Sequence, residues 1–128
     1  MDNTVQSRYF ECVMETTDTQ PLWAVTPERI REAVRRIVEA VHPCKIIMFG
    51  SHARGDATID SDVDLVVIER DVRNRVAEMI RVERALRGLI LPTDILVISE
   101  REFEGWAKTP GSVYRAAQQQ GKVVYEAT

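Results

Sequence analysis

Residues 49–69, FGSHARGDATIDSDVDLVVIE, decide the fold of this chain, because they hold the end of one predicted strand and the whole of the next. The apolar run from Lys45 to Phe49 stops at Gly50 and predicts a short buried strand. Residues 62–69 predict a second strand, whose side chains alternate between the two faces of a sheet. Asp62 and Asp64 therefore project from the same face, with their Cα atoms roughly 7 Å apart.

This carboxylate pair opens a strand that is otherwise apolar, so fold stability alone gives no reason for it. Two like charges held together repel each other, and their desolvation is costly. Mg²⁺ takes few protein oxygens and completes its shell with water and substrate phosphates. We therefore predict that Asp62 and Asp64 bind Mg²⁺; the alternative is that both are surface charges.

The turn between the two strands has the features of a phosphate site. Gly50 lets the backbone approach a ligand closely, and Ser51 offers a hydroxyl and a backbone N–H at the start of a helix. Arg54 follows one turn later and could add positive charge. This arrangement would hold a nucleoside triphosphate for attack on its α-phosphorus. The alternatives are that Ser51 is a simple helix cap and that Arg54 is solvated.

A third carboxylate, Asp94, lies on the next predicted strand, Thr93 to Ile98. If that strand pairs beside residues 62–69, Asp94 can bind the same metal or accept the acceptor's proton. It could instead be a turn residue after Pro92. His52 is expected to have a surface or packing role.

The remaining chain predicts an α/β (α+β) fold in which helices flank a small mixed sheet. We expect an irregular N-terminal arm over residues 1–22 and a single domain over residues 23–128. Thr26-Pro27 predicts a helix start, and Ser99 with Glu102 predicts a capping box. Six apolar residues at roughly helical spacing predict a second long amphipathic helix: Val72, Val76, Met79, Ile80, Leu86 and Leu89. A final helix should end at Gly121, before a short strand from Val123 to Tyr125.

Composition narrows the function classes. The 128 residues carry a net charge of −3, which disfavours direct nucleic-acid binding. Neither a signal peptide nor a membrane-spanning run is evident, so we expect a cytoplasmic protein without membrane contact. Cys12 and Cys44 have no metal-ligand spacing. Five arginines predict a solvated face or a partner-docking stripe: Arg70, Arg73, Arg81, Arg84 and Arg87. Three aromatic residues are expected in the core or at its edge: Trp23, Phe103 and Trp106.

The spacing of Gly50-Ser51 and Asp62-x-Asp64 resembles the signature of the DNA polymerase beta-like nucleotidyltransferase superfamily. Within it, the chain resembles the minimal nucleotidyltransferase (MNT) group from about Thr26 to Tyr125, including the Pro110–Tyr114 segment and Gly121. The resemblance implies that the residues matching Gly50 and Ser51 contact the triphosphate. It also implies that Asp62 and Asp64 bind metal and that Asp94 completes the site.

MNT proteins are similar to the antitoxins of two-gene systems whose toxin is a HEPN-type ribonuclease. The resemblance implies AMP transfer from ATP onto a tyrosine hydroxyl of that toxin, within a hetero-oligomer. One alternative is a binding-only antitoxin that occludes its toxin without catalysis. Another is a nucleotidyltransferase whose acceptor is a small hydroxylated molecule or an RNA end.

Overall fold

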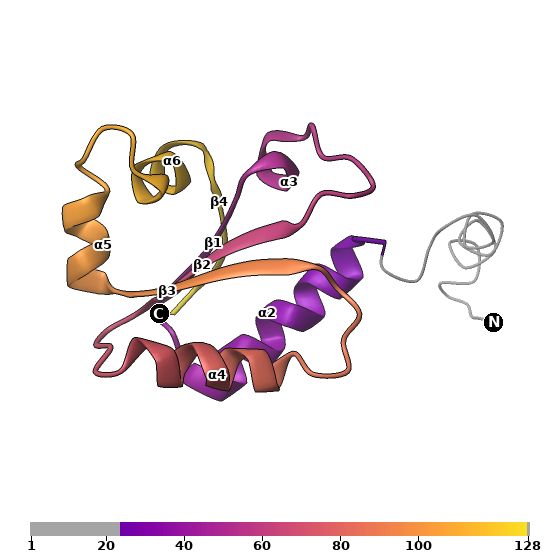
Figure 1. Cartoon of the computed structure of the whole chain (residues 1–128), viewed down its shortest axis with the longest axis horizontal. Helices are drawn as coiled ribbons and strands as arrows, with labels where there is room; N and C mark the ends of the chain where they lie inside the picture. The colour runs from indigo at the N-terminus through magenta and orange to yellow at the C-terminus, as the bar shows by residue number, and fades with distance from the viewer. Residues whose placement is uncertain (1–23, 128) are drawn as a thin grey trace, which may run out of the picture.

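The computed structural model describes residues 24–127, which form one layer of sheet between two layers of helices (Figure 1). Along the chain the elements are α2 (Pro27–Val41), β1 (Lys45–Phe49), α3 (Ser51–Arg54), β2 (Val63–Glu69), α4 (Arg75–Ala85), β3 (Thr93–Ser99), α5 (Glu100–Trp106), α6 (Val113–Gln120) and β4 (Lys122–Glu126). The α/β prediction is confirmed. The expected arm over residues 1–22, which contains Cys12, lies outside the described residues, and so does Trp23.

Local capping sets the helix boundaries that the sequence predicted. Thr26 Oγ1 accepts a hydrogen bond from the backbone N–H of Arg29 at 3.2 Å, and Pro27 opens α2. Ser99 Oγ likewise accepts from the N–H of Glu102 at 3.2 Å, which begins α5 directly after β3. These caps fix where the chain leaves the sheet and where it returns.

The sheet is mixed, with strand order β3-β2-β1-β4. β1 pairs antiparallel with β2 and with β4, whereas β2 and β3 are parallel and are connected through α4. Parallel pairing requires such a crossover, because the chain must return to the same end of the sheet. β2 is therefore central, and the segment that starts with Asp62 is flanked by β1 on one side and by β3 on the other.

Alternation along the strands divides the buried residues into two clusters. Val63, Leu65 and Val67 pack on the face that α2 and α4 cover, whereas Val66 and Ile68 pack under α5 and α6. Figure 1 shows α2 and α4 together on one side of the sheet and α3 and α6 on the other. Because side chains alternate along a strand, Asp64 lies on the same face as Val66 and Ile68, the face covered by α3 and α6.

Two expectations about buried residues are wrong. The second long helix is shorter than the apolar pattern suggested, since α4 ends at Ala85, and Val76 and Ile80 are 66% and 43% exposed. Trp106 is 52% exposed at the end of α5, whereas Phe103 is buried as expected. The helical period places Val76 and Ile80 on the side of α4 away from the buried Val82. No helix within residues 24–127 has the length and apolar character needed to span a bilayer.

Candidate active site

The site is built where β1 ends beside the start of β2. Phe49 is the register partner of Asp64, so the next residue, Gly50, lies against the Asp64 side chain. Gly50 has φ 77° and ψ −156°, a backbone conformation that is essentially restricted to glycine. A Cβ atom at this position would overlap Oδ2 of Asp64. The turn therefore needs glycine for two reasons, its backbone conformation and its close approach to a carboxylate.

Ser51 is the first residue of α3, and Gly50 occupies the N-cap position. The alternative that Ser51 is the helix cap is therefore wrong. Within the described chain its hydroxyl makes no hydrogen bond, and the first N–H groups of a helix have no partner inside it. This end of α3 thus presents donors that have no acceptor among residues 24–127, as the binding of an anionic phosphate requires.

Three carboxylates are brought to the same part of the sheet. Asp64 and Asp94 are register partners on the parallel strands β2 and β3, and Asp62 precedes the first residue of β2. Asp62 and Asp94 are exposed and Asp64 is partly buried, whereas the intervening Val63 is fully buried. Asp94 lies within a strand, which rules out its alternative role as a turn residue.

The electrostatics of Asp64 reflect this concentration of negative charge. Burial, and then the charges of Asp94 and Asp62, raise the pKa of Asp64 above its ordinary value. His52 and Arg54 act in the opposite direction. The site therefore holds more negative charge than its own cations offset, which favours the arrival of a cation.

The donors fit Mg²⁺ in number and kind. Among residues 24–127, no three His, Cys, Asp or Glu side chains converge closely enough to form a complete protein cage for a metal. Mg²⁺ does not need such a cage, because it is commonly held by one or two carboxylates together with substrate phosphates. Asp62 and Asp64, beside the free donors of Ser51, match that pattern. Their assignment as metal ligands, and that of Asp94, remains a prediction.

Arg54 and His52 surround this centre in different ways. Arg54 is half exposed, and its Nε atom pairs with Asp56 at 3.3 Å, so a phosphate contact would have to replace this ion pair. His52 lies with a ring nitrogen 3.2 Å from the carbonyl oxygen of Ser61, where it can donate a hydrogen bond to the residue before Asp62. Sequence reasoning assigned His52 to the surface or to packing; nothing in its spacing indicated this contact.

A second titratable group lies at the other end of β2, and sequence reasoning missed it. Glu69 is 7% exposed, and its Oε2 atom has no hydrogen-bond partner in the described part of the chain. Burial, and then the hydrogen bond and charge of Glu78, raise the pKa of Glu69 to about 7. Arg81 pairs with Glu78 at 3.3 Å. The alternation of side chains along β2 could have indicated its burial. Glu69 falls on the same face of the strand as Val63, Leu65 and Val67, which are buried.

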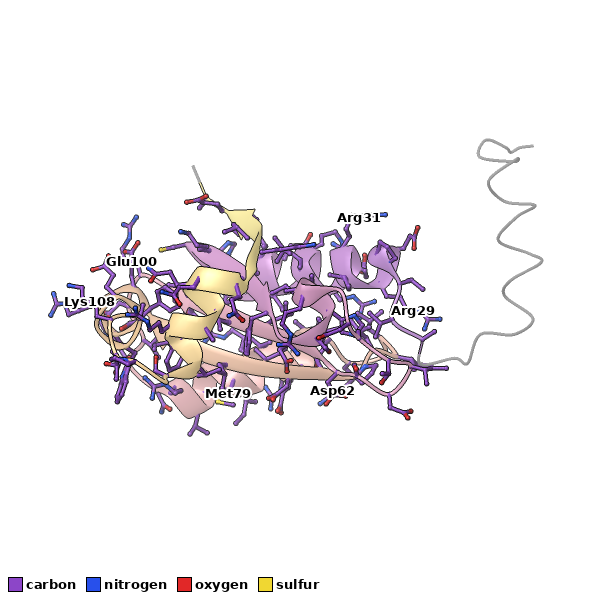
Figure 2. All side chains as sticks on the ribbon, turned by 90° about the horizontal axis from the view of Figure 1, so that it is seen from above. Arg29, Arg31, Asp62, Met79, Glu100 and Lys108 are labelled. Carbon is purple, nitrogen blue, oxygen red and sulfur yellow. The ribbon has the colours of Figure 1, made fainter. Side chains whose placement is uncertain are left out.

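The two ends of the sheet are therefore chemically distinct. Figure 2 shows Asp62 toward one end of the domain and Glu100, the first residue after β3, at the other. The glycine turn and the three carboxylates all lie at the Asp62 end. A mixed sheet with this turn and these acids at one end defines the nucleotidyltransferase class of fold.

The chain belongs to the nucleotidyltransferase domain family, whose sequence profile matches residues 27–122, and it is accordingly a nucleotidyltransferase. A proposed protein adenylyltransferase of Methanocaldococcus jannaschii is 32% identical over 81 residues, which cover 63% of this chain and 77% of that protein. The resemblance to MNT-type nucleotidyltransferases is thus confirmed.

Two solved structures share the fold. A proposed nucleotidyltransferase from Sulfolobus solfataricus superposes with a TM-score of 0.56 at 22% identity and covers 77% of this chain and 78% of its own. A toxin–antitoxin structure solved with AMP-PNP superposes with a TM-score of 0.54 at 18% identity, and the match covers 77% of this chain and 74% of that chain. At these identities the likeness concerns the fold alone.

Proposed function

We propose that this protein is a Mg²⁺-dependent antitoxin that transfers AMP from ATP onto a tyrosine hydroxyl of a HEPN-type ribonuclease toxin and so neutralises it. The observation that carries the enzymatic part is the register pairing of Asp64 with Asp94 beside the Gly50-Ser51 turn. The choice of a protein acceptor is supported by the likeness to a proposed protein adenylyltransferase. The choice of a toxin is supported by the shared fold of a toxin–antitoxin solved with a nucleotide.

Each residue of the site has a role in this reaction. The turn at Gly50 and the free donors of Ser51 would bind the triphosphate, and Arg54 would contribute if it left Asp56. Asp62 and Asp64 would hold Mg²⁺, with Asp94 as a third ligand or as the base. When bound, Mg²⁺ would offset the negative charge of the phosphates and orient them.

The group transfer balances without a further reactant. The acceptor oxygen forms a bond to the α-phosphorus, and the bond from that phosphorus to the bridging oxygen of the β-phosphate breaks. Pyrophosphate leaves with the bonding electrons. The acceptor proton would pass to the carboxylate of Asp94, which is exposed on the edge strand of the sheet.

The test mixes the protein with Mg²⁺, labelled ATP and a HEPN protein from the same genome, in the first instance one encoded by an adjacent gene. Intact mass of both chains is measured for the wild type, for Asp62→Ala/Asp64→Ala and for the control Asp71→Ala, an exposed acid after β2. We expect added AMP on the partner with the wild type and the control, and none with the double variant. A partner silenced without any added mass would instead assign the protein to the occluding, non-catalytic class.

A further inference from the structure

A groove with a volume of about 580 Å³ lies between α2 and the edge strand β4. Most of its lining residues are apolar or aromatic, and they come from both elements: Ile30, Val34 and Val38 from α2, and Val124 and Tyr125 from β4. Single exposed apolar residues are ordinary, but apolar side chains gathered in one groove are typical of a binding surface.

The remaining lining residues of this groove are charged, and their charges are balanced within the chain. Arg31 pairs with Glu28 at 3.7 Å, and Arg35 pairs with Glu32 and with Glu39 at 2.7 Å each. A strongly acidic or strongly basic partner would therefore gain little from this surface. A partner whose own charges are balanced fits it better.

The strand that lines the groove has a free outer edge. β4 pairs only with β1 among the described strands, so backbone N–H and C=O groups remain available on its other side. The register between the two strands shifts between Ile46 and Ile47, which leaves Val124 without a partner on β1. Both Val124 and Tyr125 consequently line the groove, and Val123 is 53% exposed. The edge therefore offers backbone groups and uncovered apolar side chains to another strand.

The sequence of β4 indicates which strand fits this edge. It begins with Lys122, continues with two valines and a tyrosine, and ends with Glu126. Two copies paired antiparallel about Val124 bring Lys122 of each copy beside Glu126 of the other. Lys122 has no ion pair within residues 24–127, and Glu126 makes only an exposed pair with Lys45 at 3.6 Å. The strand is thus complementary to itself in charge.

The opposite edge of the sheet lacks this property. Asp94 is the only charged residue of β3. Antiparallel pairing of two β3 strands about Leu96 would place each Asp94 beside Ile98 of the other copy, where no opposite charge meets it. Charge therefore favours β4 over β3 as a surface for self-association.

We infer that two copies of this chain associate through β4, antiparallel and about a two-fold axis, so that their sheets join into one. Such an axis uses the same surface of both copies, and it places α2 of each copy on the same side of the joined sheet. The two apolar grooves then lie side by side and cover each other. The inference does not depend on the proposed function, because it assigns no acceptor.

The experiment measures the mass of the full-length protein by sedimentation at about 1 to 100 µM. We expect the wild type to form a dimer in this range. Val123→Asp would place an unpaired charge in the joined sheet and should raise the Kd of the dimer at least about tenfold. Val113→Asp is the matched control, since this α6 side chain is 40% exposed, and it should leave the Kd unchanged. Circular dichroism verifies that each variant is folded.

Exchange of the two charges tests the antiparallel arrangement. Lys122→Glu alone should raise the Kd of the dimer, because it sets acidic side chains beside each other. Lys122→Glu/Glu126→Lys should bring the Kd back towards the wild-type value, because opposite charges meet again. Lys108→Glu, which changes an exposed lysine between α5 and α6, should have no effect. A double variant that associates no better than Lys122→Glu would overturn the antiparallel pairing.

Hydrogen exchange locates the interface. The N–H of Ala127 donates to the carbonyl of Cys44 on the β1 side at 2.9 Å, so its protection should not depend on protein concentration. The outward amides of β4 should exchange more slowly at high concentration than at low concentration, whereas those of β3 should not change. A wild type that stays monomeric at about 100 µM, or a dimer protected at β3 instead of β4, would overturn the inference. Absence of AMP transfer to a HEPN protein would contradict only the proposed function.

Discussion

Asp64 and Asp94 stand opposite each other on neighbouring parallel strands, although 30 positions separate them along the chain. The pairing places the exposed carboxylate of Asp94, at the sheet edge, beside the partly buried carboxylate of Asp64. Asp62 lies two residues before Asp64. Neither strand needs these charges for its own packing, since both strands are otherwise mostly apolar. Burial and the charges of Asp94 and Asp62 raise the pKa of Asp64, so the ionised carboxylate is unfavourable in this arrangement.

Replacing Asp64 with Asn should greatly slow nucleotide transfer without lowering stability. A carboxyl group with a raised pKa destabilises the folded state as pH rises from its ordinary value through the raised one, because the folded state holds the proton longer. Asn carries no charge, so the melting temperature at pH 7 without Mg²⁺ should equal or exceed that of the wild type. Transfer should fall by about 10²-fold or more.

The matched control for Asp64→Asn is Asp71→Asn, which changes an exposed acid outside the site. It should leave both transfer and melting temperature unchanged. A clear loss of stability in Asp64→Asn would show that this carboxylate has a structural role instead.

Gly50→Ala should impair both stability and transfer, because the added Cβ meets Asp64 Oδ2 and the backbone conformation suits only glycine. We expect a loss of about 1–3 kcal/mol in the free energy of unfolding, measured by urea denaturation. Gly55→Ala is the control, since Gly55 also has positive φ but its Cβ would meet nothing within 4 Å. It should cost about 1–2 kcal/mol from strain and leave the KM for ATP unchanged. Equal effects on KM in the two variants would contradict the proposed contact.

Ser51→Ala should raise the KM for ATP with little effect on stability. The Ser51 hydroxyl caps no helix and has no partner in residues 24–127, so its loss leaves no described donor or acceptor unsatisfied. Ser112→Ala provides the opposite case, because Ser112 Oγ accepts from the N–H of Arg115 at the start of α6. That variant should lose about 1 kcal/mol of stability and keep its KM. If Ser51→Ala destabilises the protein as much as Ser112→Ala does, the hydroxyl has a structural role.

Glu69→Gln should change how stability depends on pH. The pKa of Glu69 in the folded protein is about 7, above the ordinary value of 4.5. The folded state therefore binds more protons between these values, and the free energy of unfolding of the wild type falls as pH rises from about 4.5 to about 7.

At pH 8 the Glu69→Gln variant should exceed the wild type in stability by on the order of 1–3 kcal/mol, because Gln can donate a hydrogen bond to Glu78 without repelling it. Below pH 4.5 the difference should largely vanish. The control Glu100→Gln, an exposed acid at the start of α5, should follow the wild type at every pH. Parallel pH profiles for Glu69→Gln and the wild type would contradict the assignment.

The sequence by itself determined the features that depend on neighbouring residues. Alternation predicted that Asp62 and Asp64 share one face, and the caps at Thr26 and Ser99 fixed two helix starts. The boundaries of β1 followed from an apolar run that ends at glycine. These features are local, since each depends on residues within a few positions of one another.

Only the tertiary structure decided which distant residues meet. The parallel pairing of β2 and β3 brought Asp94 to Asp64, and the approach of α4 to β2 brought Glu78 to the buried Glu69. The same packing left Val76 and Ile80 uncovered, although their spacing in the sequence is that of a buried helix face. A helical period shows that apolar residues share a side, but the neighbouring elements determine which side is buried, and this depends on contacts between segments far apart in the chain.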